Sequence, residues 1–349
     1  MRIYNVIFSM LTMMMLAVSC SSDDNVDDAI INPPLGDYEN GFFILNEGDA
    51  STGSVSFIKN DFSFAKHDIY GAENDGDGIG GFVQSIFFDG DRAFIISNGS
   101  NMITVVNRYT FKLIAKIETG FEVPRYGVVL NGKAYVTNLG GFANLTDDFI
   151  SVINLSNFQL EAPIAVNAVA DKLTEENGKL YVLNGNYGSG TSVKIINPEN
   201  GVTENTIELG LSPNSFQEYE GSLYVLASGF ADAGKIFKIN FSSNNVESTV
   251  TFPASLANAQ NLAIENDKTY FTIDSKVYSN NLGSIAVSET PLFTSAAITL
   301  YGFLLKDGRI YVSDAKDYVS NGQIFVYTTD GTLNYSSITG VNPNGFYFN

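Results

Sequence analysis

The side chains that most often perform catalysis are scarce in this sequence. The chain contains a single histidine, His67, and a single cysteine, Cys20, and it has no tryptophan. These counts cannot supply a histidine-rich zinc site, a disulfide or a Cys-His dyad. His67 is expected on an outer strand, where it would be badly placed to activate a nucleophile. Adjacent carboxylates such as Asp147 and Asp148 would point to opposite faces of a strand, which disfavours an acid–base pair. The sequence therefore predicts a protein that is not an enzyme.

One acidic loop has the spacing of a cation site. Glu73, Asp75 and Asp77 stand at alternate positions just before Gly78, which resembles the first half of an EF-hand calcium loop. The second half is missing, because Gln84 occupies the position where such a loop needs a bidentate glutamate. We expect no cofactor other than this candidate for weak Ca²⁺ binding at the three carboxylates. A solvated acidic turn is the alternative.

Aromatic and amide side chains are concentrated in the segments between the predicted strands. An aromatic ring offers a flat apolar surface and an amide directs hydrogen bonds, so the combination suits a planar or sugar-like ligand. Alternatively, the amides serve tight turns and the rings pack between sheets. The candidate ligand-binding residues are Arg125, Tyr126, Asn138, Asn184, Tyr187, Asn214, Phe230, Gln260, Tyr301 and Tyr318.

The segments that must position these residues repeat along the chain. A turn followed by a short aromatic strand occurs seven times, as in residues 132–138 (GKAYVTN) and 178–184 (GKLYVLN). The aligned aromatic residues are 41 to 51 residues apart, and they are Phe43, Phe94, Tyr135, Tyr181, Tyr224, Tyr270 and Tyr311. Each repeat has room for four short strands in which β-branched and aromatic residues alternate with polar ones. This length and strand number are typical of a β-propeller blade.

We therefore expect an all-β, seven-bladed β-propeller with four-stranded blades over residues 41–349. A β-helix is disfavoured, because its coils would be shorter and more uniform. The first strand, at Gly41, corresponds to the second strand of a repeat, and residues 343–348 (PNGFYF) resemble a first strand. The C-terminal strand is thus expected to complete the first blade and to remove the open sheet edges.

Composition and charge narrow the partners. Hydrophobic residues make up 44% of the chain and charged residues 16%, which is ample for a core and excludes extended disorder. The 19 basic and 38 acidic residues give a net charge of −19. Such a chain would repel a phosphate backbone, so we expect no nucleic-acid partner.

The N-terminal segment predicts export and a lipid anchor. Residues 1–19 contain Arg2 and a short apolar run, as in a signal peptide. Residues 16–20 (LAVSC) resemble a bacterial lipobox, although Ala17 replaces the usual leucine, so Cys20 is the expected lipidation site. Residues 20–40 form a polar linker whose aspartates resemble an export signal for the outer face of the outer membrane. We expect a protein anchored in the outer membrane and exposed on the cell surface.

The repeats and the anchor together resemble a known family. The unit GKxYVxN, the opening residues 43–48 (FILNEG) and the lipobox are similar to those of YncE-like, surface-layer-type seven-bladed propellers, including the cobalamin-capturing lipoproteins of TonB-dependent transporters. The resemblance implies capture of a nutrient ligand, corrinoid-like or saccharide, or docking on an outer-membrane transporter. A protein-binding or adhesive propeller and a metal-dependent propeller lactonase or hydrolase are the alternatives, because the repeats specify blades and not a ligand.

Overall fold

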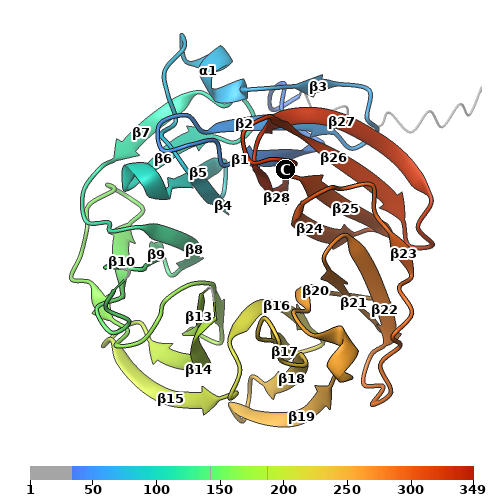
Figure 1. The fold of residues 1–349 in the computed structure, drawn as a ribbon. Coiled ribbons are helices and arrows are strands. Elements are labelled where there is room, and N and C mark those ends of the chain that lie inside the picture. The colour runs from blue at the N-terminus through green and yellow to red at the C-terminus, as the bar shows by residue number, and fades with distance from the viewer. Residues whose placement is uncertain (1–33, 142, 187) are drawn as a thin grey trace, which may run out of the picture. The chain divides into compact units, whose positions relative to one another are not determined.

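The computed structural model describes residues 34–141, 143–186 and 188–349, and residues Leu35–Asn349 form one compact unit. This unit consists of seven four-stranded antiparallel sheets arranged in a ring around a central channel (Figure 1). The predicted seven-bladed β-propeller is therefore confirmed. The unit begins shortly before Gly41, because Tyr38 is buried against the rings of Phe57 and Phe111 in the first blades.

The blades are numbered in chain order, and the strands of each are given from the channel outward. Blade 1 contains β28 (Pro343–Phe348), β1 (Gly41–Asn46), β2 (Ser54–Lys59) and β3 (Ala65–Lys66). Blade 2 contains β4 (Val83–Asp89), β5 (Arg92–Ser97), β6 (Met102–Asn107) and β7 (Leu113–Ile117). Blade 3 contains β8 (Pro124–Leu130), β9 (Lys133–Asn138), β10 (Phe149–Asn154) and β11 (Ile164–Ala165).

Blades 4 to 7 repeat this order. Blade 4 contains β12 (Leu173–Glu176), β13 (Lys179–Asn186), β14 (Ser189–Asn197) and β15 (Val202–Glu208). Blade 5 contains β16 (Pro213–Tyr219), β17 (Ser222–Ala227), β18 (Lys235–Asn240) and β19 (Asn245–Thr251). Blade 6 contains β20 (Gln260–Glu265), β21 (Lys268–Ile273), β22 (Lys276–Asn281) and β23 (Phe293–Thr294). Blade 7 contains β24 (Leu300–Lys306), β25 (Arg309–Asp314), β26 (Asn321–Thr328) and β27 (Leu333–Val341).

Helices contribute little to this fold. The described residues contain α1 (Ile69–Glu73) and two single 3₁₀ turns, η1 (Asn98–Ser100) and η2 (Ala254–Leu256). Among these residues, no helix is both long and apolar enough to cross a membrane.

The ring is closed by strands from both ends of the compact unit. Strand β28 pairs with β1 in antiparallel register, with Phe43 opposite Tyr347 and Ile44 opposite Phe346. The predicted completion of the first blade by the C-terminal strand is confirmed. Closure hides the backbone hydrogen-bonding groups that an open edge would expose.

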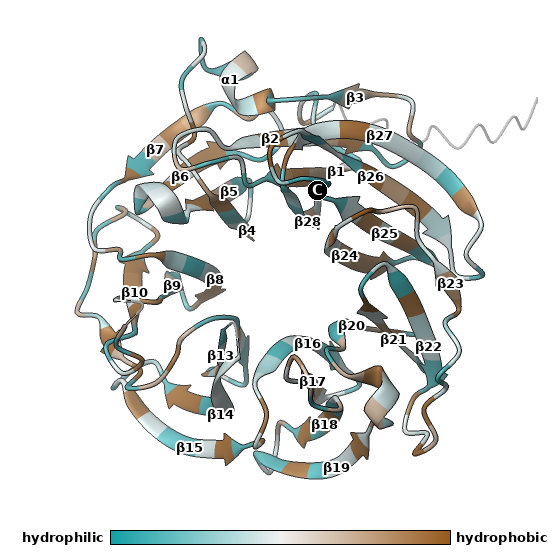
Figure 2. Cartoon of the chain, viewed as in Figure 1, coloured by the Kyte–Doolittle hydropathy of each residue, from teal (hydrophilic) through white to brown (hydrophobic). Residues whose placement is uncertain are grey.

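The hydrophobic core lies between neighbouring blades. Every aligned aromatic residue of the seven repeats is buried, with at most 8% of its surface exposed. Tyr181 of blade 4, for example, belongs to the same cluster as Val225 of blade 5. Figure 2 shows hydrophobic residues along β25 and β26, whereas the innermost strand β16 is more hydrophilic. Successive side chains point to opposite faces of a blade, so the adjacent residues Phe43 and Ile44 pack in different inter-blade clusters.

Candidate ligand-binding site

The innermost strands share an irregularity near their first residues. In six of the seven, the antiparallel register shifts there, as at a β-bulge. A bulge leaves a residue outside the regular pairing and redirects its side chain. We call the polar residues in these irregular segments the bulge ring, and they are Gln84, Arg125, Tyr126, Asn214, Asn261, Tyr301 and Asn344. All of them line one cavity at the channel mouth.

This central cavity has a volume of about 560 Å³ and receives side chains from several blades. Besides the bulge ring, its lining includes Glu47, Asp171, Lys172, Asn186 and Phe230. A volume of this size is within the range of small-molecule sites, roughly 300–1,000 Å³.

The charged side chains in the central cavity are balanced and already have protein partners. Arg125 is 9% exposed, and its Nε donates to Asp171 Oδ1 at 2.8 Å. Lys172 Nζ donates to the Asn214 carbonyl at 2.7 Å, and burial lowers the pKa of this lysine. Because the remaining acid, Glu47, brings the lining to two cations and two anions, the cavity favours a neutral polar ligand over a strongly charged one.

Glu47 is hydrogen-bonded to one residue of the bulge ring. The Tyr301 hydroxyl donates to Glu47 Oε2 at 2.6 Å. Burial raises the pKa of the Glu47 carboxyl, and the Tyr301 hydrogen bond and the Arg125 charge offset only part of that rise. The contact therefore fixes the Tyr301 ring at the edge of the cavity.

The aromatic side chains differ in their accessibility. Phe230 is 76% exposed at the mouth of the central cavity. Tyr126 is half-buried in the wall, its hydroxyl accepts a hydrogen bond from Gln84 Nε2 at 3.2 Å, and burial raises its pKa. Phe230 is thus free to cover a ligand, whereas Tyr126 forms part of a fixed surface.

A side cavity of about 390 Å³ adjoins the central one. Its lining includes Thr272, Asp274, Ile298, Thr299 and Tyr318. The Tyr318 ring meets the Tyr301 ring edge-to-face, with 5.7 Å between centroids. The two cavities share Asn258, Gln260, Asn261 and Tyr301.

Most of the candidate residues lie at these two cavities. Those that line the central cavity are Arg125, Tyr126, Asn214, Phe230, Gln260 and Tyr301. Tyr318 lines the side cavity. Tyr187 and the expected lipidation site Cys20 lie outside the described residues.

Asn138 and Asn184 do not line either cavity, and their prediction as ligand-binding residues requires correction. Both are buried near the ends of second strands, 0% and 1% exposed. Asn138 Oδ1 accepts the backbone N–H of Glu122 at 3.0 Å, and its Nδ2 donates to the Ser151 hydroxyl. Asn184 Nδ2 donates to the Val169 carbonyl at 2.6 Å. These asparagines recur because each forms a hydrogen bond with the backbone of the segment that enters its blade. The sequence pattern alone does not distinguish this structural role from ligand binding.

The predicted calcium loop also requires correction. Glu73 accepts hydrogen bonds from Lys66 Nζ at 2.8 Å and from the Tyr38 hydroxyl at 2.7 Å, and these bonds lower its pKa to about 2. Asp77 forms an ion pair with Lys116 at 2.8 Å, and Asp75 is exposed. Within the described residues, no group of three or more His, Cys, Asp or Glu side chains could hold a metal ion. Lys66 and Lys116 therefore pair with Glu73 and Asp77, two of the carboxylates that a calcium ion would need as ligands.

Sequence reasoning missed several residues of the central cavity. They are Glu47, Gln84, Asp171, Lys172, Asn186 and Asn344. Gln84 and Asn344 occupy the start of an innermost strand, as Tyr126 and Asn214 do. Aligning the first strands of the repeats would have found these two.

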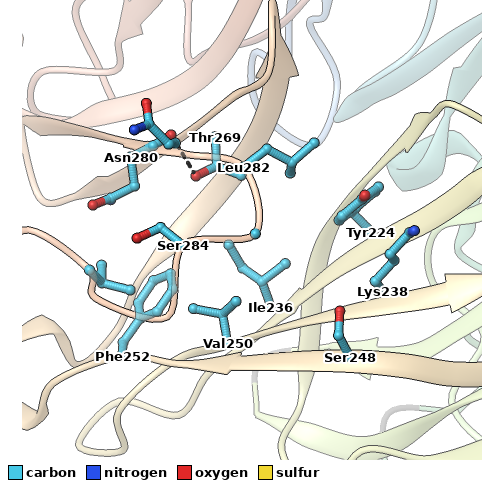
Figure 3. Close-up of a pocket in the computed structure, with 13 residues that line it drawn as sticks. Tyr224, Ile236, Lys238, Ser248, Val250, Phe252, Thr269, Asn280, Leu282 and Ser284 are labelled. Atoms are coloured by element: carbon cyan, nitrogen blue, oxygen red, sulfur yellow. Dashed lines mark hydrogen bonds between the residues drawn. The ribbon is translucent and has the colours of Figure 1, made fainter.

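A further cavity of about 290 Å³ lies between blades 5 and 6, away from the channel mouth. Figure 3 shows Ile236, Val250 and Phe252 on one side of it and Leu282 on the other. These residues belong to the hydrophobic cluster between the two blades, so we interpret this cavity as a packing gap.

Comparisons with known proteins agree on the fold. A family model described as Domain of unknown function (DUF5074) matches residues 40–339. No curated protein matches the chain. A hypothetical selenium-binding protein from Sulfolobus tokodaii is similar, with a TM-score of 0.65, 9% identity, and 90% of this chain and 94% of that chain covered.

Two further solved structures are similar. For the dihydro-heme d1 dehydrogenase NirN in complex with DHE, the TM-score is 0.56 at 12% identity, over 89% of this chain and 76% of that chain. For the hydrazine synthase of Kuenenia stuttgartiensis, the TM-score is 0.55 at 12% identity, over 74% of this chain and 86% of that chain. At these identities the likeness shows a shared propeller fold and no shared activity.

Proposed function

The chain belongs to the family described as Domain of unknown function (DUF5074), and we propose that it is a non-catalytic capture protein. In this proposal it binds a neutral polar nutrient, corrinoid-like or saccharide, at the channel mouth. It then passes this ligand to an outer-membrane transporter on which it docks.

The main support is a pair of unsatisfied polar atoms in two residues that line the central cavity. Asn186 Nδ2 and Asn344 Oδ1 are buried and have no hydrogen-bond partner among the described residues. Both residues line the central cavity. A buried polar atom without a partner costs about 1–3 kcal/mol, and a ligand that donates to one and accepts from the other would remove this cost. Hydroxyls and carboxamides have this dual character.

The rim around the cavities supports docking. Phe230, Ile298 and Tyr318 are 76%, 77% and 52% exposed, and all line the two cavities at the channel mouth. Apolar side chains gathered on one face favour a protein partner. The expected lipid on Cys20 would hold the domain beside outer-membrane proteins, and the family resemblance favours a TonB-dependent transporter among them.

Direct titration tests capture. The mature chain in detergent is titrated calorimetrically with cyanocobalamin and with neutral malto-, cello- and xylo-oligosaccharides. We expect at least one of these probes to bind, and Phe230→Ala to weaken that binding by about 1–3 kcal/mol, roughly 5- to 150-fold. Val319→Ala is the matched control, because Val319 is equally exposed but lines neither cavity. Absence of binding for every probe contradicts the proposal.

A further inference from the structure

We propose that the binding site has two lobes and that its ligand spans both. This inference rests on the proposed function and specifies the kind of ligand. The central cavity is one lobe and the side cavity is the other. The residues shared by the two lobes, Asn258, Gln260, Asn261 and Tyr301, form the divider between them.

The divider is held in place by its own hydrogen bonds. Asn258 and Asn261 adopt left-handed backbone conformations, with φ of 59° and 60°. Gln260 Nε2 donates to Asn258 Oδ1 at 3.1 Å, and Asn261 Nδ2 donates to the Thr272 hydroxyl at 2.9 Å. With Tyr301 fixed through Glu47, the divider is a preformed ridge over which a ligand can lie.

The two lobes present similar chemistry. The central lobe offers the unpartnered Asn186 Nδ2 and Asn344 Oδ1. The side lobe offers the hydroxyl oxygens of Thr272, Ser275 and Thr299 as acceptors, because their hydrogens already bond to the backbone carbonyls of the protein. Asp274 is the only charged lining residue of this lobe. Each lobe therefore offers acceptors to neutral groups that donate hydrogen bonds, such as hydroxyls and carboxamides.

The volumes set the size of the ligand. Cavities of about 560 and 390 Å³ can each hold one small molecule, so a ligand that fills both is larger than a single sugar or nucleobase. A chain of hydroxyl-bearing rings and a macrocycle bearing several primary carboxamides both meet this description. Their shared chemistry is a set of neutral hydrogen-bonding groups spread over two separated parts of one molecule.

One variant in each lobe tests this arrangement. Asn186 lines only the central lobe and Tyr318 only the side lobe, so Asn186→Ala and Tyr318→Ala are the two variants, and Val319→Ala is the control. The long probes are heptasaccharides of the malto series, hexasaccharides of the cello and xylo series, and cyanocobalamin. The short probes are the corresponding disaccharides and dicyanocobinamide, which lacks the nucleotide arm. The saccharide and corrinoid arms distinguish the two ligand sources.

We expect each single variant to lower the affinity for the long probe that binds by about 10-fold. The double variant should lower it by the product of the two losses. The matching short probe should respond to only one of the two variants. If Asn186→Ala fails to fold, Phe230→Ala replaces it, and Ile298→Ala replaces Tyr318→Ala in the same way.

Two results would overturn the inference by different routes. If a probe binds and Tyr318→Ala leaves the affinity for every probe unchanged, the ligand is confined to the central lobe, and the proposed function stands without the second lobe. If no probe binds at all, the proposed function fails and the two-lobed site fails with it.

Discussion

Arg125 Nε lies 2.8 Å from Asp171 Oδ1, and this ion pair joins the innermost strand of blade 3 to the segment that enters blade 4. The two side chains are only 11% and 10% exposed. Arg125 also donates to the Gln84 side chain of blade 2. Three consecutive blades are thus connected through one guanidinium at the channel mouth.

Removing one partner of this buried pair should be costly. Asp171→Ala removes the carboxylate that pairs with Arg125 Nε, so we expect the free energy of unfolding to fall by about 3–5 kcal/mol in urea titrations. The double variant Arg125→Met, Asp171→Leu should recover much of this loss, because apolar side chains need no counterion. A loss below about 1 kcal/mol for Asp171→Ala would show that the pair is solvated.

Ring closure should control cooperativity. Deleting residues 343–349 removes β28 and leaves β1 with an unpaired edge, so we expect the single cooperative melting transition to be lost. Phe346→Ala is a milder change. Its ring is 6% exposed and lies 5.7 Å from the Tyr311 ring, so its loss should cost about 3–5 kcal/mol. An unchanged melting temperature for the deletion would contradict closure by β28.

The buried Asn138 should act on stability and not on binding. Asn138→Ala leaves the Glu122 N–H and the Ser151 hydroxyl without this partner, so we expect a loss of about 1–3 kcal/mol in unfolding free energy. Gln260→Ala is the contrasting variant. Gln260 is exposed, so its truncation should leave stability nearly unchanged while ligand affinity falls. Equal effects of the two variants on affinity, measured by calorimetry, would contradict this division of roles.

Asp148 should make stability depend on pH. Burial, together with the neighbouring Asp147 and Asp171 charges, raises the pKa of Asp148 to about 6, and the Ala170 N–H offsets part of this. Between about pH 4 and pH 6 the folded chain retains a proton that the unfolded chain loses, so the Asp148 contribution to stability falls as pH rises. Asp148→Asn should remove this fall and be relatively more stable at pH 7. Urea titrations at pH 4, 5, 6 and 7 measure the difference, and parallel curves for both proteins would contradict the shift.

The anchor is tested by fractionation. Cys20→Ser removes the predicted acylation site, so the protein should move from the membrane fraction to the soluble fraction of cells. Replacing Asp23 and Asp24 by alanine should leave it in the membrane fraction but protect it from external protease. Unchanged fractionation of Cys20→Ser would refute the lipid anchor.

The repeats in the sequence were sufficient to predict the fold. An aromatic residue that recurs at nearly constant spacing, such as Tyr135 and Tyr181, must pack in an equivalent position in every blade. The resemblance of residues 343–348 to a first strand also predicted ring closure, because β pairing depends on local pattern and on the removal of free edges. The candidate site was predicted in part, since ring closure brings the starts of the innermost strands to one mouth.

Tertiary structure decided which polar residues face the ligand. Asn138 and Asn214 both lie near strand ends and have the same side chain. Asn138 is buried and hydrogen-bonds to Glu122 and Ser151, whereas Asn214 lines the central cavity. Asn138 ends the second strand β9, whereas Asn214 lies at a one-residue bulge in the innermost strand β16, and this bulge depends on how β16 pairs with β17. The pairing of Arg125 with Asp171 likewise joins residues 46 positions apart, and only the assembled ring brings them together.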